Sequence, residues 1–229
     1  MQELLGASRE LLGAVWGGAF VPALFHPKGE PSNEGHNQPV LFIPGLGGSD
    51  YSLGVLRMRL RHRDFRTYRS GIWNSGDVRK LVQCLLVRLD SIAQETGQAV
   101  ALVGHSLGGR IACHLADEAP NLIRSIVTMG TPYGKRQLPA LAERLPLDAL
   151  VAEMGTRCHL PRKTPLTVIV GLHDQIVSFE GATLKRHELR PRYREQRLVD
   201  TDHLGLPFLM DIPALVAEGV LKQSKRTVH

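Results

Sequence analysis

The strongest constraint on the fold is a glycine–serine turn that links an apolar segment to a helix-like one. Residues 99–103 read AVALV, residues 104–108 read GHSLG, and an amphipathic helical pattern follows. A chain that passes directly from a buried strand into a helix must turn sharply, and glycines on both sides of Ser106 leave room for that turn. Such a turn lifts the serine hydroxyl out of the sheet and directs helix N-terminal amides toward developing negative charge. The segment therefore predicts a nucleophile elbow in an α/β protein.

Two later strand ends carry the partners that a serine nucleophile needs. The apolar run 167–172 leads into Asp174, and the strand-like segment 196–200 leads into a loop that holds His203. Because the carboxyl ends of parallel strands share one edge of the sheet, these side chains should meet Ser106 there. The chain order serine, acid, histidine predicts a triad in which His203 takes the serine proton and Asp174 orients the imidazole.

Neighbouring polar residues offer alternatives for the acid and for a metal site. Asp200 and Asp202 are rivals of Asp174 because both lie close to His203 in sequence, and Asp202 could instead hydrogen-bond within its own turn. A metal site that combines these groups with His173 is conceivable, but the residues lack a standard ligand spacing such as H-E-x-x-H. We therefore expect no metal.

A glycine-rich turn provides a candidate oxyanion hole. The apolar segment 40–43 is followed directly by PGLGG at 44–48, a turn that can present a backbone N–H to the site. The predicted donors are the amides of Leu46 and of Leu107, the residue after the nucleophile. The residues expected to contact the substrate are Gly45, Gly47, His105 and Tyr133.

Strands and helices alternate along the chain, which predicts a mostly parallel sheet of about six strands with flanking helices. The expected strands lie near residues 40–43, 67–72, 98–103, 123–129, 166–170 and 196–200. Apolar residues at helical spacing from Val78 to Ile92 predict a helix that Asp77 caps. We expect residues 1–38 to form an N-terminal helix and a flexible linker from Pro27, and residues 39–229 to form the catalytic domain.

These motifs resemble those of α/β-hydrolases, in particular small bacterial lipase-like and esterase-like serine hydrolases. MGTPYG at 129–134 is similar to the family's G-T-P-x-x-G turn, and DQIV at 174–177 is similar to the D-x-x-V turn around its acid. The likeness runs from Pro39 to Pro213, although Pro44-Gly45 replaces the His-Gly pair of many members. The resemblance implies an α/β-hydrolase fold without a large cap domain, and cofactor-free cleavage of a carboxylic ester through an acyl-enzyme on Ser106. A thioesterase, an acyltransferase or a non-catalytic binding module with the same fold is the alternative.

The segment 133–164 has an apolar side and a basic side. It could form a small lid over an acyl pocket or an ordinary crossover helix, and both interpretations remain open. The expected ligand is a small or lipid-like acyl ester.

Charge and cysteine content limit which partners and which disulfides can be expected. The net charge is +6, and six arginines lie between residues 57 and 69, where a solvated helix face and strand edge is favoured over a surface for anionic lipids. With 5% aromatic residues and no recognised nucleic-acid module, nucleic acid is not an expected partner. Three cysteines are too few for a disulfide framework, and Cys84 and Cys113 are expected to be buried thiols.

The N-terminal residues 11–25 carry no charge, yet they are fewer than the ~20 needed to span a bilayer. Glu3 precedes the first basic residue, unlike the start of a signal peptide. We expect a cytoplasmic protein in which residues 11–25 cover the fold or touch a membrane surface. Secretion is the less favoured alternative, and the sequence does not indicate an oligomeric state.

Overall fold

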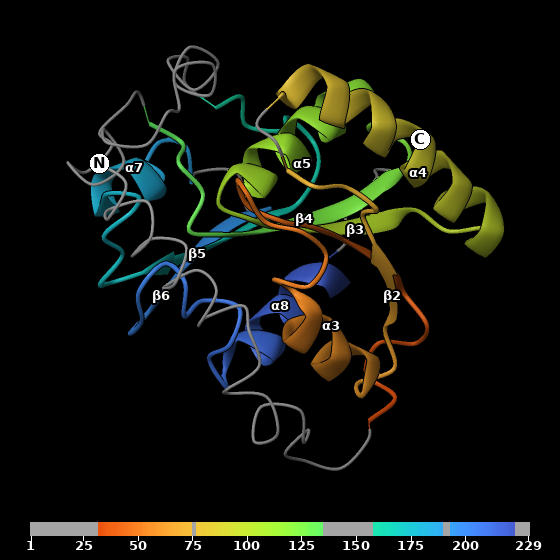
Figure 1. Cartoon of the computed structure of the whole chain (residues 1–229), viewed down its shortest axis with the longest axis horizontal. Coiled ribbons are helices and arrows are strands. Elements are labelled where there is room, and N and C mark those ends of the chain that lie inside the picture. The colour runs from red at the N-terminus through yellow and green to blue at the C-terminus, as the bar shows by residue number, and fades with distance from the viewer. Residues whose placement is uncertain (1–31, 75–76, 135–157, 190–192, 223–229) are drawn as a thin grey trace, which may run out of the picture. The chain divides into compact units, whose positions relative to one another are not determined.

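The computed structural model describes residues 32–74, 77–134, 158–189 and 193–222, shown in colour in Figure 1. The chain divides into two compact units, Met1–Glu30 and Pro31–His229, and all the described residues belong to the second. They contain a six-stranded sheet, parallel throughout, with the strand order β2-β1-β3-β4-β5-β6. The strands are β1 (Pro39–Ile43), β2 (Arg66–Arg69), β3 (Val100–His105), β4 (Ile123–Met129), β5 (Leu166–Gly171) and β6 (Arg194–Val199).

Helices cover both faces of the sheet (Figure 1). The described helices are α3 (Gly54–Arg61), α4 (Val78–Thr96), α5 (Leu107–Glu118), α7 (Phe179–Ala182) and α8 (Ile212–Leu221). The core that contains α4 and α5 takes Leu41 and Ile43 from β1, while the core that contains α3 and α8 takes Val40 and Phe42. Because successive side chains of a strand point to opposite faces, a strand that is apolar throughout fills both cores.

Local signals explain where α4 begins and ends. The Asp77 carboxylate accepts a hydrogen bond from the Lys80 amide at 3.1 Å, which satisfies one of the unpaired N–H groups of the first turn. At the other end, Gly97 adopts a left-handed φ of 65°, and its amide closes the last turn onto Ala93. The helix and the cap predicted from the sequence are confirmed.

All six predicted strands are present, but the bounds of β2, β3 and β6 differ from the predicted ones by two or more residues. Strand β2 ends at Arg69 rather than at residue 72, because Asp50 accepts hydrogen bonds from the Ser70 and Gly71 amides and turns the chain away from the sheet. Strand β3 extends to His105, which pairs with Met129 on β4. The predicted serine turn therefore begins directly at the end of the strand.

Three other expectations need correction. Cys84 is exposed rather than buried, while Cys113 is buried as predicted, and all three cysteines are free thiols. The end of the predicted flexible linker is a packed turn, in which Gly35 and Asn37 donate to the Arg63 and Asp64 carbonyls, both at 2.8 Å.

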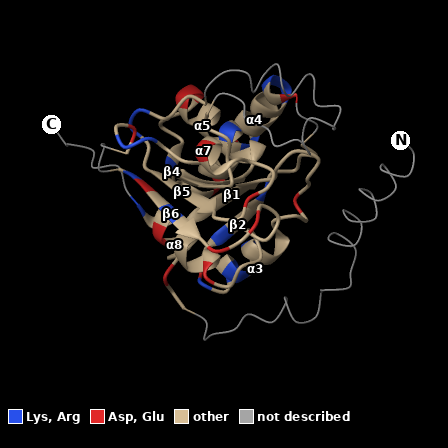
Figure 2. Cartoon of the chain, turned by 90° about the vertical axis from the view of Figure 1, so that its left-hand side faces the viewer, with Lys and Arg blue, Asp and Glu red and all other residues tan. Residues whose placement is uncertain are grey.

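The arginine cluster is also less solvated than expected. Arg59 is buried, and its guanidinium donates to the Phe208 carbonyl at 2.9 Å. Arg63 pairs with Glu34, and Arg66 pairs with Glu95. Basic and acidic residues accordingly both occur along the ribbon around α3 and β2 in Figure 2. Only Arg59 departs from the solvated face by full burial, whereas Arg61, Arg66 and Arg69 are exposed as expected.

The strand order fixes where a site can form. The chain leaves β1 toward β2 on one side and then returns to β3 on the other, so the loops after β1 and β3 diverge at the carboxyl edge of the sheet. In open parallel sheets ligands bind in the crevice at such a switch point. Ile43 is in register with Gly104, which places the loop 44–48 beside the serine turn. Within the described ranges, no helix is long and apolar enough to cross a membrane.

Candidate active site

Ser106 occupies a strained turn between β3 and α5. Its φ of 53° and ψ of −123° lie in a region that residues with a side chain rarely adopt. The surrounding structure holds this conformation from both sides, because the Ser106 amide donates to the Met129 carbonyl at 2.8 Å and the Ser106 carbonyl accepts from the Thr131 hydroxyl at 3.0 Å. The strain is therefore stabilised by neighbours on and after β4.

The glycines of the turn are required by close packing. A Cβ at Gly108 would lie 2.2 Å from the Ile43 carbonyl oxygen, and a Cβ at Gly104 would lie 2.5 Å from the Gly109 Cα. Helix α5 can thus begin against the end of β1 only because these positions lack a side chain. The same packing brings Gly45 close to the nucleophile, since a Cβ at Gly45 would lie 3.1 Å from the Ser106 Cβ.

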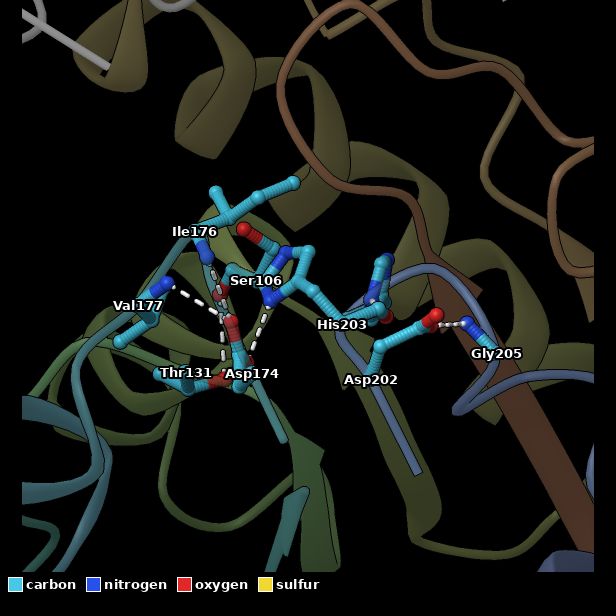
Figure 3. A network of polar contacts seen from close by, with 9 residues as sticks. Ser106, Thr131, Asp174, Ile176, Val177, Asp202, His203 and Gly205 are labelled. Carbon is cyan, nitrogen blue, oxygen red and sulfur yellow. Dashed lines mark hydrogen bonds and ion pairs between the residues drawn. The ribbon is translucent and has the colours of Figure 1, made fainter. Parts of the chain in front are cut away.

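Asp174 and His203 form a buried pair. The Nδ1 of His203 donates to Oδ2 of Asp174 at 2.6 Å, and the two side chains are 5% and 1% exposed. The other carboxylate oxygen, Oδ1, accepts from the amides of Ile176 and Val177 at 2.9 and 2.8 Å. A carboxylate held in this way fixes the tautomer that carries the proton on Nδ1 and leaves Nε2 able to accept a proton. In Figure 3 the His203 imidazole points toward the Asp174 carboxylate, and Ser106 overlaps the ring in this view.

The alternative acids are engaged elsewhere. Asp200 pairs with His173 at 2.7 Å, and both of these side chains are exposed. Asp202 accepts from the Gly205 amide within its own turn at 2.6 Å, as the sequence suggested (Figure 3). In the part of the chain that the structure describes, no three His, Cys, Asp or Glu side chains are grouped so that they could hold a metal ion.

His105 packs against the candidate base. Its Nε2 donates to the His203 carbonyl at 3.0 Å, and the centroids of the two rings are 4.8 Å apart. Burial lowers the pKa of His105 to about 3, with the charge of His203 as a second lowering effect, although the hydrogen bond and Asp174 act in the opposite direction. A neutral imidazole with its proton on Nε2 follows. His105, which was expected to contact the substrate, is thus hydrogen-bonded to the loop that carries His203.

The loop 44–48 has most of its backbone groups paired. The Gly47 amide donates to the Asn74 carbonyl at 2.8 Å, and the Gly48 amide donates to the Gly45 carbonyl at 3.0 Å. Gly47 has a φ of 66°, and a Cβ there would meet nothing within 4 Å. Among the described residues, the Leu46 and Leu107 amides donate to no backbone carbonyl, and Leu107 is the first residue of α5.

Tyr133 is turned into the core rather than toward the other candidate residues. It is 3% exposed, and its hydroxyl lies 2.5 Å from Thr128 Oγ1. Its carbonyl accepts from the Cys158 amide at 3.1 Å, so the two ends of the segment 134–157 are joined. The lid or helix expected within 133–164 lies largely outside the described residues, as does the N-terminal segment 11–25.

Sequence reasoning missed two residues at the site. Gly130, with a φ of 56°, makes room for the base, because a Cβ there would lie 3.0 Å from His203 Nδ1. Asn74 is fully buried, and its side-chain amide donates to the Pro44 carbonyl at 2.8 Å. Its position after the carboxyl end of β2, at the same edge as the other candidates, is the signal that could have revealed it.

Comparisons with known proteins agree with the fold. Residues 89–160 match a family model described as the alpha/beta hydrolase fold. A triacylglycerol lipase from Pseudarthrobacter phenanthrenivorans is 30% identical over 105 residues, which cover 42% of this chain and 33% of that protein. The chain thus spans about a third of the length of such curated relatives.

Solved structures extend the likeness over most of the chain. A lipase-esterase related protein from Clostridium acetobutylicum superposes with a TM-score of 0.59 at 16% identity, covering 82% of this chain and 94% of that one. The RedJ thioesterase of the prodiginine biosynthetic pathway in Streptomyces coelicolor gives 0.58 at 17% identity, covering 85% and 92%. The parallel sheet, the serine turn and these similarities show that the chain has the alpha/beta hydrolase fold.

Proposed function

We propose that this protein is a serine hydrolase that cleaves carboxylic esters through an acyl-enzyme on Ser106. The observation that carries the proposal is the buried Asp174–His203 pair at the edge of the sheet where Ser106, held at positive φ, follows β3. A serine hydroxyl is a weak nucleophile until a base removes its proton, and with Nδ1 of His203 bonded to Asp174 the imidazole Nε2 is the atom that can take it. The similarity to triacylglycerol lipases over 105 residues supports an ester with a moderately apolar acyl group.

The proposed reaction has two acyl-transfer steps. Ser106 Oγ attacks the ester carbonyl while His203 takes its proton, and the alcohol leaves with that proton. Water then attacks the acyl-enzyme with His203 again as base, which releases the acid and restores the serine. The negative charge that develops on the carbonyl oxygen in each step is stabilised by the Leu46 and Leu107 amides. All proton transfers and charges are thus handled by groups of the chain itself.

The packing of the site supports the assignment of the two amide donors. Gly45 lies against Ser106, which brings the Leu46 peptide close to the nucleophile. Leu107 begins the helix that follows the serine, so its amide lacks an intrahelical acceptor and gains from the positive end of the helix dipole.

The test is hydrolysis of p-nitrophenyl esters from acetate to palmitate by the full chain and by Ser106→Ala. Ser125→Ala is the control, because it also removes a serine hydroxyl, here a buried one that donates to the Val220 carbonyl at 2.8 Å. We expect turnover in the wild type and in Ser125→Ala and its loss in Ser106→Ala. Turnover that survives in Ser106→Ala contradicts the proposal. Hydrolysis of acyl thioesters alone assigns the same residues to a thioesterase, and no turnover by the folded protein points to a binding module.

A further inference from the structure

The inference concerns Asn74 and rests on the proposed function. If Leu46 donates its amide to an oxyanion, the peptide between Gly45 and Leu46 must keep one orientation. In a trans peptide the carbonyl and the N–H point in opposite directions, so the direction of the Gly45 carbonyl sets the direction of the Leu46 amide. The Gly45 carbonyl accepts from the Gly48 amide at 3.0 Å, inside the loop itself. The direction of the Leu46 amide therefore depends on the contacts that hold the turn from Gly45 to Gly48 in place against Ser106.

Asn74 makes three hydrogen bonds to this loop. Its side-chain Nδ2 donates to the Pro44 carbonyl at 2.8 Å, its carbonyl accepts from the Gly47 amide at 2.8 Å, and its amide donates to the Gly48 carbonyl at 3.0 Å. These bonds fix the peptide planes on both sides of the Gly45–Leu46 peptide. The residue belongs to the segment after β2, and the adjoining Trp73 forms an isolated bridge with Ser49.

The side-chain bond is the one that depends on the identity of the residue. Any amino acid could supply the two backbone bonds, but only a short side chain with an N–H donor can reach the Pro44 carbonyl from this position. Asn74 is fully buried, so the Pro44 carbonyl would lose its partner without gaining water if the amide were removed. The Pro44–Gly45 peptide would then be free to rotate, and the Leu46 amide would lose its fixed direction.

We propose that Asn74 is a positioning residue that holds the loop 44–48 so that the Leu46 amide faces the oxyanion. It acts through the loop and does not touch the substrate. Removing one oxyanion donor typically costs on the order of 10²–10³ in kcat, and misdirecting it should cost a part of that. The loss should fall on kcat, because the amide acts on charge that develops in the transition state rather than on the bound substrate.

The experiment compares Asn74→Ala and Asn74→Asp with the wild type in kcat, KM and the affinity for a tetrahedral trifluoromethyl ketone. Gln38→Ala is the matched control, because Gln38 is also a buried amide that donates to a backbone carbonyl, Ala99 at 2.9 Å, next to the amino end of β1. We expect both Asn74 variants to lose at least about tenfold in kcat with little change in KM. Their affinity for the ketone should fall by the same factor. Gln38→Ala should lose thermal stability but keep its kcat.

Active-site titration with a fluorophosphonate counts the folded, reactive molecules, so that kcat refers to these alone. Asn74→Asp, which keeps the size of the side chain but has no N–H donor, decides the test if Asn74→Ala does not fold. An unchanged kcat per reactive site, a rise in KM alone, or an equal loss in Gln38→Ala overturns the proposal. Failure of the proposed function is distinguishable, because the wild type itself would then show no turnover that depends on Ser106.

Discussion

At the scale of single residues, two neighbouring histidines have different environments and different expected roles. His203 donates a hydrogen bond to a buried carboxylate. His105 donates to a carbonyl and remains neutral, because burial lowers its pKa to about 3. A base must be able to gain a proton, and a group that stays neutral can serve only as a support. His203 is thus the proposed base, and His105 helps to position the loop that carries it.

The role of the acid can be tested by comparing aspartates. Asp174→Ala should lower kcat by about 10²–10⁴, less than Ser106→Ala, because the imidazole then loses its orientation but the serine and the amide donors remain. Asp200→Ala is the control, since Asp200 is exposed and bonded to His173. Steady-state ester hydrolysis measures both variants. A kcat loss in Asp200→Ala with none in Asp174→Ala would mean that the acid is wrongly assigned.

The buried His105 predicts a pH-dependent stability. Unfolded His titrates near 6.5, so between about pH 6.5 and pH 3 the unfolded chain binds a proton that the folded chain excludes. Stability is therefore complete above this window and decreases as the pH falls through it, by about 1.4 kcal/mol per pH unit. In urea unfolding the wild type should lose about 2 kcal/mol more than His105→Gln between pH 7 and pH 5. Equal losses in the two proteins would exclude this cause.

At the scale of elements, the site depends on how closely α5 begins against β1. This contact can be tested with a matched pair of glycines, Gly108 in the first turn of α5 and Gly54 in the first turn of α3, where a Cβ would meet nothing within 4 Å. Gly108→Ala should reduce the free energy of unfolding by about 1–3 kcal/mol because the Ile43 carbonyl must move. Gly54→Ala should be neutral or stabilising, since alanine favours the helix. Denaturant unfolding measures the free energy of unfolding of both variants. Equal changes in Gly108→Ala and Gly54→Ala would contradict the packing argument.

The elements were largely predictable from the sequence, because apolar runs and caps are local signals. All six strands and α4 were predicted, and the differences at β2 and β3 arise from contacts between segments, such as that of Asp50 with Ser70. The same reason applies to the site. Motifs and chain order predicted Ser106, Asp174 and His203 as a triad, and the structure shows the hydrogen bond between Asp174 and His203 and the positive φ of Ser106.

The residues that sequence reasoning missed act across the fold. Asn74 and Gly130 matter through what they touch 30 or more positions away, at Pro44 and at His203, and no periodicity reports such contacts. Tyr133 was expected to meet the substrate because it belongs to a recognised turn, but its ring is buried in the core. A motif thus locates a turn, whereas packing decides which way its side chains face.

At the scale of the whole molecule, every predicted site residue belongs to the unit Pro31–His229. Both cores of the sheet are built from described residues of this unit. We therefore expect a chain of residues 31–229 to hydrolyse p-nitrophenyl butyrate with the kcat of the full chain. If residues 11–25 contact membranes, vesicle sedimentation should show that the full chain binds and the shortened chain does not. Loss of activity on shortening would contradict the proposed division of the domains.

The central claim is that Ser106 is the nucleophile, and its most direct test is intact-protein mass spectrometry after reaction with a fluorophosphonate. We predict one adduct per chain, located at Ser106 by peptide mapping and missing in Ser106→Ala. A folded wild type that takes up no adduct, or an adduct that persists in Ser106→Ala, would contradict the account.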